Sequence, residues 1–441
     1  MAAWCDAVSP GAPLAAAFTD GPLFAFVAGA ALRLAWASSG KSPSRLAAPA
    51  VILAAAVLTS TVVELHQLQR VSPRDPILPE LWQYLATDYW TAPSAYPVLN
   101  LAFRWLAWLG LAICAERIVA DSPVRERLAG AWLGAGVVAA ILTGTHTIAI
   151  LLRSAEPSAV LVHLLSEARI SVLQPDVNAA GSHFALFLLP AVVLALRGAG
   201  RSRLWPTIVV ALVGLAFLAA RSRAAIGAVI LVAVVAWVVR QAASGGLRRA
   251  LLVAIPVALV LLAAVFVMTG RSNVPASTAL QYRHEMTVVA LRAIERYPMF
   301  GVGLGDYART TRRLYDDGVP LLQRAAPDGE NAHNNLLQIA VELGLPAAAA
   351  FLWLVLPAAA IGLGRRQVSA ECLGMSLGLA AFLASALLGH PLLVPQVGVA
   401  LFLALGLTAG LDPARQRSGL ARDLGLVGVV FYLTSLVWRL A

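Results

Sequence analysis

The sequence contains little charge. Of its 441 residues, 13% are Asp, Glu, Lys or Arg, whereas 59% are hydrophobic. A water-soluble protein cannot hide so much apolar surface and still present a polar exterior. Continuous apolar runs of about 17 to 25 residues fit membrane-spanning helices, and the ~10-residue alternating segments of a membrane barrel are lacking. The sequence therefore predicts an all-α, polytopic membrane protein.

Cysteine and clustered metal ligands are scarce as well. The three cysteines are Cys5, Cys114 and Cys372, and the last two lie in apolar runs, so no disulfide framework is expected. None of the seven His forms a set with Cys or carboxylates at ligand spacing, which predicts neither a metal site nor a cofactor. The chain start lacks a basic region followed by a cleavage site, so no removable signal peptide is expected.

The net charge of +10 would indicate nucleic acid binding in a soluble protein. In a membrane protein, Arg and Lys in short loops set the orientation of the spans instead. We therefore expect contacts with membrane lipids and no nucleic acid partner.

Hydropathy predicts about twelve membrane spans. Four short basic loops, at residues 197–203, 240–249, 364–366 and 413–422, fall on one side, which the positive-inside rule makes cytoplasmic. Larger loops at 65–97, 152–181 and 269–335 then lie outside. The chain thus divides into N-terminal spans over 1–268, a large outer loop over 269–335 and C-terminal spans over 336–441. The expected spans are near residues 15–37, 46–64, 98–118, 128–151, 182–197, 204–220, 224–241, 249–268, 336–362, 370–388, 395–410 and 424–440.

The large outer loop carries eight Arg against seven Asp and Glu, so it is nearly neutral. Its stretch ALQYRHEMTVVALRAIERYP predicts an amphipathic helix closed by Pro298. Residues 81–97 of another outer loop are rich in Trp and Tyr and predict a segment at the lipid interface. The expected apolar face of the amphipathic helix contains Leu280, Met286, Val289, Ala290 and Ile294.

Two arginines, Arg221 and Arg223, fall in a very short outer turn between two spans. Arg close to the membrane usually faces a cavity or a partner, and its planar guanidinium suits a phosphate. The alternative is that these side chains reach lipid headgroups. The outer location weakens that alternative, because positive residues are depleted on the outer side.

Further polar residues and glycines lie in the large loop. Arg283 and His284 are either surface residues of the amphipathic helix or substrate contacts. Gly301, Gly303 and Gly305 alternate in YPMFGVGLGDY. Because glycine permits tight turns and close backbone approach, this stretch either docks the loop or contacts substrate.

The stretch GENAHNNLLQIAVELGLPA, residues 329–347, gathers polar side chains where an apolar run begins. Asn334 or Asn335 can cap a helix there. His333 then sits at the helix N-terminus, where the dipole lowers the pKa of an imidazole. A neutral imidazole can act as a general base. The alternative interpretation is a helix cap alone.

Further along this run, Asn334, Gln338 and Glu342 share one helix face. Glu342 would lie one or two turns inside the membrane, where an ionisable residue indicates either a function or a polar interhelical contact. The sequence LGLP then predicts a kink or a restart of the helix. Earlier in the chain, Asp176 or Asn178 is expected to cap the fifth span.

Four of these segments together resemble the O-antigen ligase and polymerase superfamily of bacterial membrane glycosyltransferases. They are SRAAIGA after a span, YRHEM with ALRAIERYPMFGVGLGDY in the large loop, HNNLLQIAVELGLPA opening the next span, and PDVN before the fifth span. The resemblance covers roughly residues 175–360. It implies a GT-C-like ligase fold of about a dozen helices with one large periplasmic loop, in the bacterial inner membrane.

The resemblance also implies a chemistry. Family members move a glycan from undecaprenyl diphosphate to an acceptor at the periplasmic face, and Arg223, Arg283 and His333 match the residues that surround the diphosphate and the reacting hydroxyl. The chain has Ala224 and Ala347 where family members often have Gly. The expected reaction is a one-step, inverting displacement without a metal.

The remaining site residues are expected to assist. We expect Arg221 to help bind the diphosphate and Glu330 or Glu342 to orient the base, with substrate contacts also from the residues Asn334, His284 and Gly303. A ligase would use lipid A–core as acceptor, whereas a polymerase would extend another lipid-linked glycan, and the acceptor could also be a protein side chain. A lipid-linked glycan transporter is less favoured, because no internal repeat is visible and few charges lie mid-span. A non-catalytic assembly partner is a further alternative.

Overall fold

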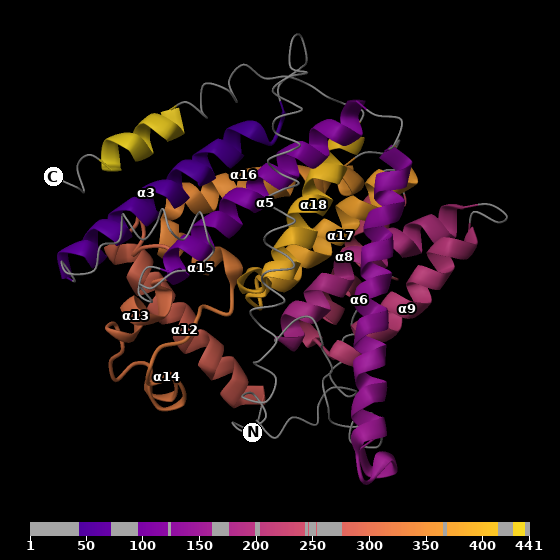
Figure 1. Ribbon diagram of the computed structural model, residues 1–441, viewed down its shortest axis with the longest axis horizontal. Coiled ribbons are helices and arrows are strands. Elements are labelled where there is room, and N and C mark those ends of the chain that lie inside the picture. Colours follow the sequence, from indigo (N-terminus) through magenta and orange to yellow (C-terminus); the bar gives the residue numbers. More distant parts are fainter. Residues whose placement is uncertain are drawn as a thin grey trace.

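Long apolar helices dominate the computed structural model (Figure 1). The structure describes residues 44–71, 96–121, 125–160, 176–198, 203–242, 246, 253, 276–364, 368–412 and 427–436. All regular elements in these ranges are helical, which confirms the all-α expectation for this part of the chain. They are α3 (Ala47–Val71), α5 (Tyr96–Asp121), α6 (Arg125–Arg153), α8 (Val177–Arg197), α9 (Leu204–Ala220), α10 (Arg223–Ala242), α12 (Ala276–Arg296), α13 (Tyr307–Arg312), α14 (Pro320–Ala325), α15 (Asn335–Leu343), α16 (Leu345–Gly364), α17 (Ala370–Ala386), the 3-10 helix η3 (Pro391–Leu393) and α18 (Pro395–Leu411).

Six of the described helices are long and apolar enough to cross a membrane, namely α3, α5, α6, α8, α10 and α16. The helices α9, α17, α18 and Val427–Leu436 are apolar but shorter. The expected spans at 15–37 and 249–268 and the aromatic segment at 81–97 lie outside the described residues, apart from residues 96, 97 and 253. These observations fit a multi-pass membrane protein. The total of about twelve spans and the outer location of the large loop remain predictions.

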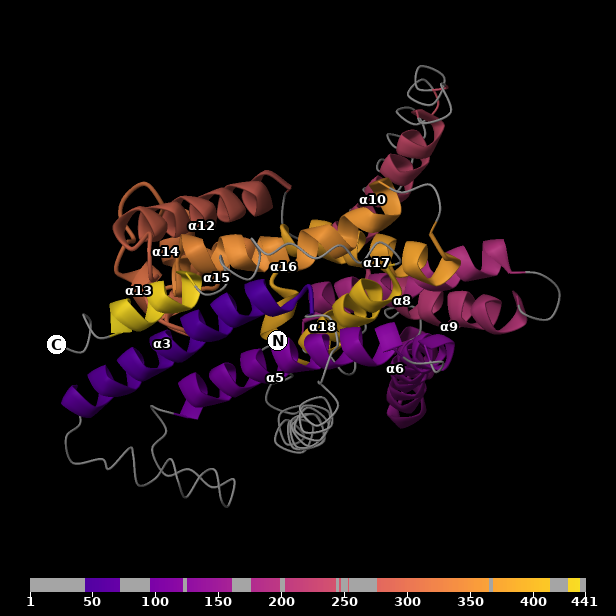
Figure 2. The ribbon, with the colours of Figure 1, turned by 90° about the horizontal axis from the view of Figure 1, so that it is seen from above.

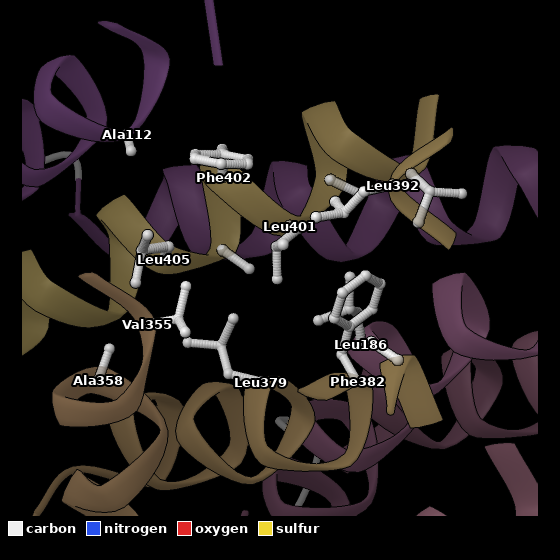
Figure 3. Close-up of a cluster of buried hydrophobic side chains, with 14 of the residues drawn as sticks. Ala112, Leu186, Val355, Ala358, Leu379, Phe382, Leu392, Leu401, Phe402 and Leu405 are labelled. Carbon is white, nitrogen blue, oxygen red and sulfur yellow. The ribbon is translucent and has the colours of Figure 1, made fainter. Parts of the chain in front are cut away.

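The hydrophobic core lies where α8, α16, α17 and α18 meet. Helix α8 packs against α17 and α9, and α18 packs along α5. Figure 3 shows apolar side chains from these helices and from η3 pointing toward one another. Small residues allow the close approach that membrane helices use. A Cβ atom at Gly378 of α17 would lie only 2.8 Å from the Leu186 carbonyl oxygen of α8.

The described part of the large loop, residues 276–335, contains α12, α13 and α14 and packs against α15 at one end of the bundle (Figures 1 and 2). Helix α12 ends at Arg296, shortly before Pro298, which confirms the amphipathic helix. Met286 and Val289 are buried against α14, as expected, but Leu280 is 68% exposed. The described part of the chain therefore leaves Leu280 uncovered on the predicted apolar face.

The expected span over 336–362 is divided into α15 and α16 at LGLP, where a kink or a restart of the helix was predicted. Gly344 (φ 89°) separates α15 from α16, and a Cβ atom there would lie 2.5 Å from the Met299 carbonyl carbon. The Leu345 amide donates a 2.8 Å hydrogen bond to the Pro298 carbonyl oxygen. The loop backbone therefore presses into the break between the two helices. The predicted restart at LGLP is confirmed.

Candidate functional site

The short turn between α9 and α10 carries both predicted arginines. Arg221 ends α9 in the left-handed conformation (φ 47°), and its amide donates to the Leu218 carbonyl oxygen at 3.1 Å. Ser222 caps α10 by accepting from the Ala225 amide at 3.3 Å. Arg223 is the first residue of α10. A non-glycine residue with positive φ is uncommon, and such conformations concentrate at functional sites.

This turn packs against the start of α8. The Ser222 hydroxyl lies 3.5 Å from the Asn178 side-chain oxygen, at the long limit of a hydrogen bond. One turn further on, Gly181 leaves no room for a side chain between α8 and Ser222. Asp176 caps α8, because its Oδ1 accepts from the Asn178 amide at 2.9 Å. The predicted cap is confirmed, and the arginine turn is held beside it.

His333 lies at the start of α15 in a second strained conformation. Its φ of 45° makes it, with Arg221, one of two non-glycine residues with positive φ in the described ranges. The Asn331 side-chain oxygen accepts from the His333 amide at 3.3 Å. Asn334 caps α15 by accepting from the amides of Leu336 and Leu337 at 2.9 and 3.1 Å. This cap was predicted, and it fixes the backbone position of His333, the preceding residue.

The environment of His333 keeps its imidazole neutral. The pKa of His333 is lowered to about 4, chiefly by burial and also by His390 and Arg283, although the carboxylates of Glu330 and Asp176 raise it. A lowered pKa was expected from the helix dipole, but burial is its largest cause. The ring centroids of His333 and His390 are 4.4 Å apart, in an edge-to-face arrangement. At neutral pH, His333 can therefore accept a proton.

Arg283 lies on α12 within electrostatic range of His333. It is partly buried, and burial lowers the pKa of its guanidinium. Its neighbour His284 is exposed. The structure thus brings Arg283 to the histidine and leaves His284 at the surface of the helix.

Glu342 supports the His333 loop indirectly. It is buried and accepts a hydrogen bond from the Gln338 Nε2 at 2.5 Å. The Gln338 Oε1 in turn accepts from the Ala332 amide at 3.0 Å. The shared face is confirmed, and Glu342 is two hydrogen bonds away from the residue before His333. Glu330 is closer to the cluster, and its Oε1 accepts from the Asn331 amide at 3.0 Å.

Gly303 lies between α15 and α3. Its amide donates to the Glu342 carbonyl oxygen at 3.1 Å, and a Cβ atom there would lie 2.9 Å from the Glu64 Oε2 of α3. The next residue, Leu304, donates from its amide to the Ser60 hydroxyl at 2.9 Å. These contacts favour the docking interpretation of the alternating glycines.

Sequence reasoning missed His390 and assigned Asp176 only a cap. His390 lies between α17 and η3, and its Nε2 is 3.5 Å from the Asp176 Oδ2. A signal was available, since Gly389-His390-Pro391 separates two expected spans on the side that also carries Asp176 and His333. A lone histidine in a short loop was too weak a pattern to single out.

The assembled site can bind an anion and move a proton. Around the neutral imidazole of His333, Arg283 supplies positive charge, and Glu330 and Asp176 supply carboxylates. The arginine turn packs against the start of α8, which Asp176 caps. In the described residues no group of three or more His, Cys, Asp or Glu is arranged to hold a metal ion.

Residues 208–352 match the family model described as O-antigen ligase. The matched segment contains all the site residues predicted from the sequence, whereas Asp176 and His390 lie outside it. No curated protein and no solved structure gave a significant match to the chain.

Proposed function

The chain belongs to the O-antigen ligase family, and we propose that it transfers a glycan from undecaprenyl diphosphate to lipid A–core at the periplasmic face of the bacterial inner membrane. The family implies a membrane glycosyltransferase of the ligase or polymerase type, with a lipid-linked glycan and an acceptor as substrates. The choice of donor, acceptor and membrane face rests on the resemblance of the motif residues and on the expected orientation of the spans.

The observation that carries the proposal is the environment of His333. Its imidazole is neutral at physiological pH and lies within electrostatic range of Arg283. A transferase that attacks with a hydroxyl group needs a base for the hydroxyl proton and positive charge for the leaving group. Both requirements meet around this residue.

The proposed reaction is a single displacement. The acceptor hydroxyl oxygen forms a bond to the anomeric carbon while the bond from that carbon to the diphosphate oxygen breaks. The electron pair of the broken bond goes to the diphosphate, which Arg223 and Arg283 stabilise. His333 accepts the hydroxyl proton. One displacement inverts the anomeric configuration, and no metal ion is required.

The other predicted residues have supporting roles in this proposal. Arg221 adds positive charge beside Arg223. Asn334 holds the His333 backbone through the helix cap. Glu330 orients the imidazole and favours its protonated form, because its carboxylate raises the pKa of His333. Glu342 stiffens the loop through Gln338.

Transfer by the purified protein tests the proposal. The full chain in lipid nanodiscs receives an undecaprenyl-diphosphate oligosaccharide together with either lipid A–core or a second lipid-linked oligosaccharide. Elongated lipid A–core supports the ligase. Elongation of the second lipid-linked oligosaccharide would instead identify the protein as a polymerase. If the donor is not consumed with either acceptor, the proposal is refuted.

Two substitutions test the assigned residues. His333→Ala should lower kcat by roughly 10²- to 10⁴-fold, the usual contribution of a general base. Arg223→Ala should raise the donor KM and lower kcat/KM, and exposed Arg313→Ala is the matched control. Near-normal turnover by folded His333→Ala would refute the base, and normal use of donor by Arg223→Ala would refute the phosphate clamp.

A further inference from the structure

A second imidazole stands beside the predicted base. His390 comes from the loop between α17 and η3, outside the segment that matches the family model. Its side chain is 13% exposed, and its ring meets that of His333 at 79° with 4.4 Å between centroids. The edge-to-face contact restricts how the His333 ring can turn, because ring pairs prefer offset or edge-to-face geometry.

Asp176 fixes His390 from the other side. The two Asp176 oxygens have separate roles, since Oδ1 caps α8 and Oδ2 lies 3.5 Å from the His390 Nε2. This separation is an ion-pair distance and not a hydrogen bond, so the Asp176 carboxylate acts on the His390 ring through its charge. The Nδ1 is buried and has no hydrogen-bond partner in the described part of the chain. Asp176, His390 and His333 therefore form an ordered row of side chains from three separate elements.

The backbone around this row is held in place. The Asn335 side chain of α15 accepts from the Leu392 amide at 3.2 Å, which ties the start of α15 to the loop of His390. The Ser385 hydroxyl of α17 donates to the Ser182 hydroxyl of α8 at 2.8 Å. Both bonds join the elements that carry the row, so its geometry does not depend on one contact.

We propose that His390, held by Asp176, is a positioning residue for the His333 base. This inference rests on the proposed function. The His390 ring keeps the His333 imidazole oriented toward the acceptor hydroxyl, and the Asp176 carboxylate balances the positive charge that His333 gains when it takes the proton. The proton stays on His333 during the displacement, so no further group is needed to complete the step.

The charges around the row define the expected pH dependence. The groups that act on His333 are His390 and Arg283, which lower its pKa, and Glu330 and Asp176, which raise it. His390 itself has a pKa lowered by burial and raised by Asp176 and Glu330. Replacing His390 by Phe should therefore raise the pKa of His333, and replacing Asp176 by Asn should lower it.

The test compares His390→Phe and Asp176→Asn in the transfer assay, over a series of pH values. His390→Phe should lower kcat roughly 10- to 100-fold, because a small misplacement of a reacting group costs about this much. Its donor KM should stay within about twofold, because His390 does not bind the diphosphate. The acid limb of kcat/KM should move to higher pH in His390→Phe and to lower pH in Asp176→Asn. Since Asn caps helices as well as Asp does, the second variant keeps the start of α8.

Exposed His146 on α6 supplies the control variant His146→Phe, which should match the wild type. The inference is overturned if His333→Ala is inactive while both variants keep the wild-type kcat and the wild-type acid limb of kcat/KM. That outcome would leave the proposed function standing. An active His333→Ala would refute the proposed base instead. If His390→Phe is not recovered as a folded protein, an unmoved acid limb in Asp176→Asn overturns the inference by itself.

Discussion

Gly181 offers a direct test of whether the arginine turn must stay close to α8. A Cβ atom at this position would overlap the Ser222 Cβ and lie 3.0 Å from the Ala225 Cβ. Since carbon atoms pack best at about 3.5 to 4.0 Å, Gly181→Ala must push α8 and α10 apart by roughly 1 Å. Such overpacking usually costs about 1 to 3 kcal/mol.

The displacement should reach the site because Ser222 lies between Arg221 and Arg223. A misplacement of about 1 Å can cost on the order of 100-fold in rate. We therefore expect Gly181→Ala to lower kcat/KM roughly 10- to 100-fold in the transfer assay. The midpoint of thermal unfolding should fall only by a few degrees, since one packing defect is spread over a large protein.

Two further variants make the Gly181→Ala test decisive. Gly134→Ala on α6 adds the same methyl group where no heavy atom lies within 4 Å, so it should be silent. Ser222→Gly removes the overlapped side chain, and Gly at a helix cap costs only a few tenths of a kcal/mol. The double variant should recover much of the lost activity, which a double-mutant cycle measures. Equal activity of Gly181→Ala and Gly134→Ala, or a cycle without coupling, would refute the reasoning.

Three other predictions concern the loop and the base. Gly344→Ala places a Cβ atom 2.5 Å from the Met299 carbonyl carbon at positive φ, so thermal unfolding should occur well below the wild-type midpoint, and an unchanged midpoint would contradict the close packing. Asn334→Ala removes a cap and should cost about 0.5 to 2 kcal/mol in denaturant unfolding, whereas Asn334→Asp should not; equal losses would exclude capping. Glu330→Gln removes a carboxylate that raises the pKa of His333, so the acid limb of kcat/KM should move to lower pH, and an upward shift would contradict the assigned charges.

Local features of the fold were predictable from the sequence. Asp176 and Asn334 cap helices through their own side chains and the next few amides, so a short stretch contains all the information. The extent of α12 follows from its apolar repeat and from Pro298. The long apolar helices were also predictable, because hydropathy is a property of each continuous stretch of sequence.

Long-range contacts were not predictable in this way. Leu280 fits the apolar repeat of α12, yet its side chain is 68% exposed. The site row joins Asp176, His333 and His390 across more than 200 residues of chain. No local pattern specifies which loops come together. The sequence therefore pointed to His333 and to the helix cap at Asp176, but not to His390, which lies between them.

The anchoring of the large loop on α3 has a consequence for chimeric proteins. Besides the Ser60 bond to Leu304, Arg309 of α13 forms a 2.8 Å ion pair with the buried Glu64 of α3. A designer who exchanges residues 276–343 between two family members would therefore bring the wrong partner to α3. The chimera should acquire the acceptor preference of the protein that supplied the loop only when the Ser60–Glu64 stretch of that protein is exchanged together with the loop.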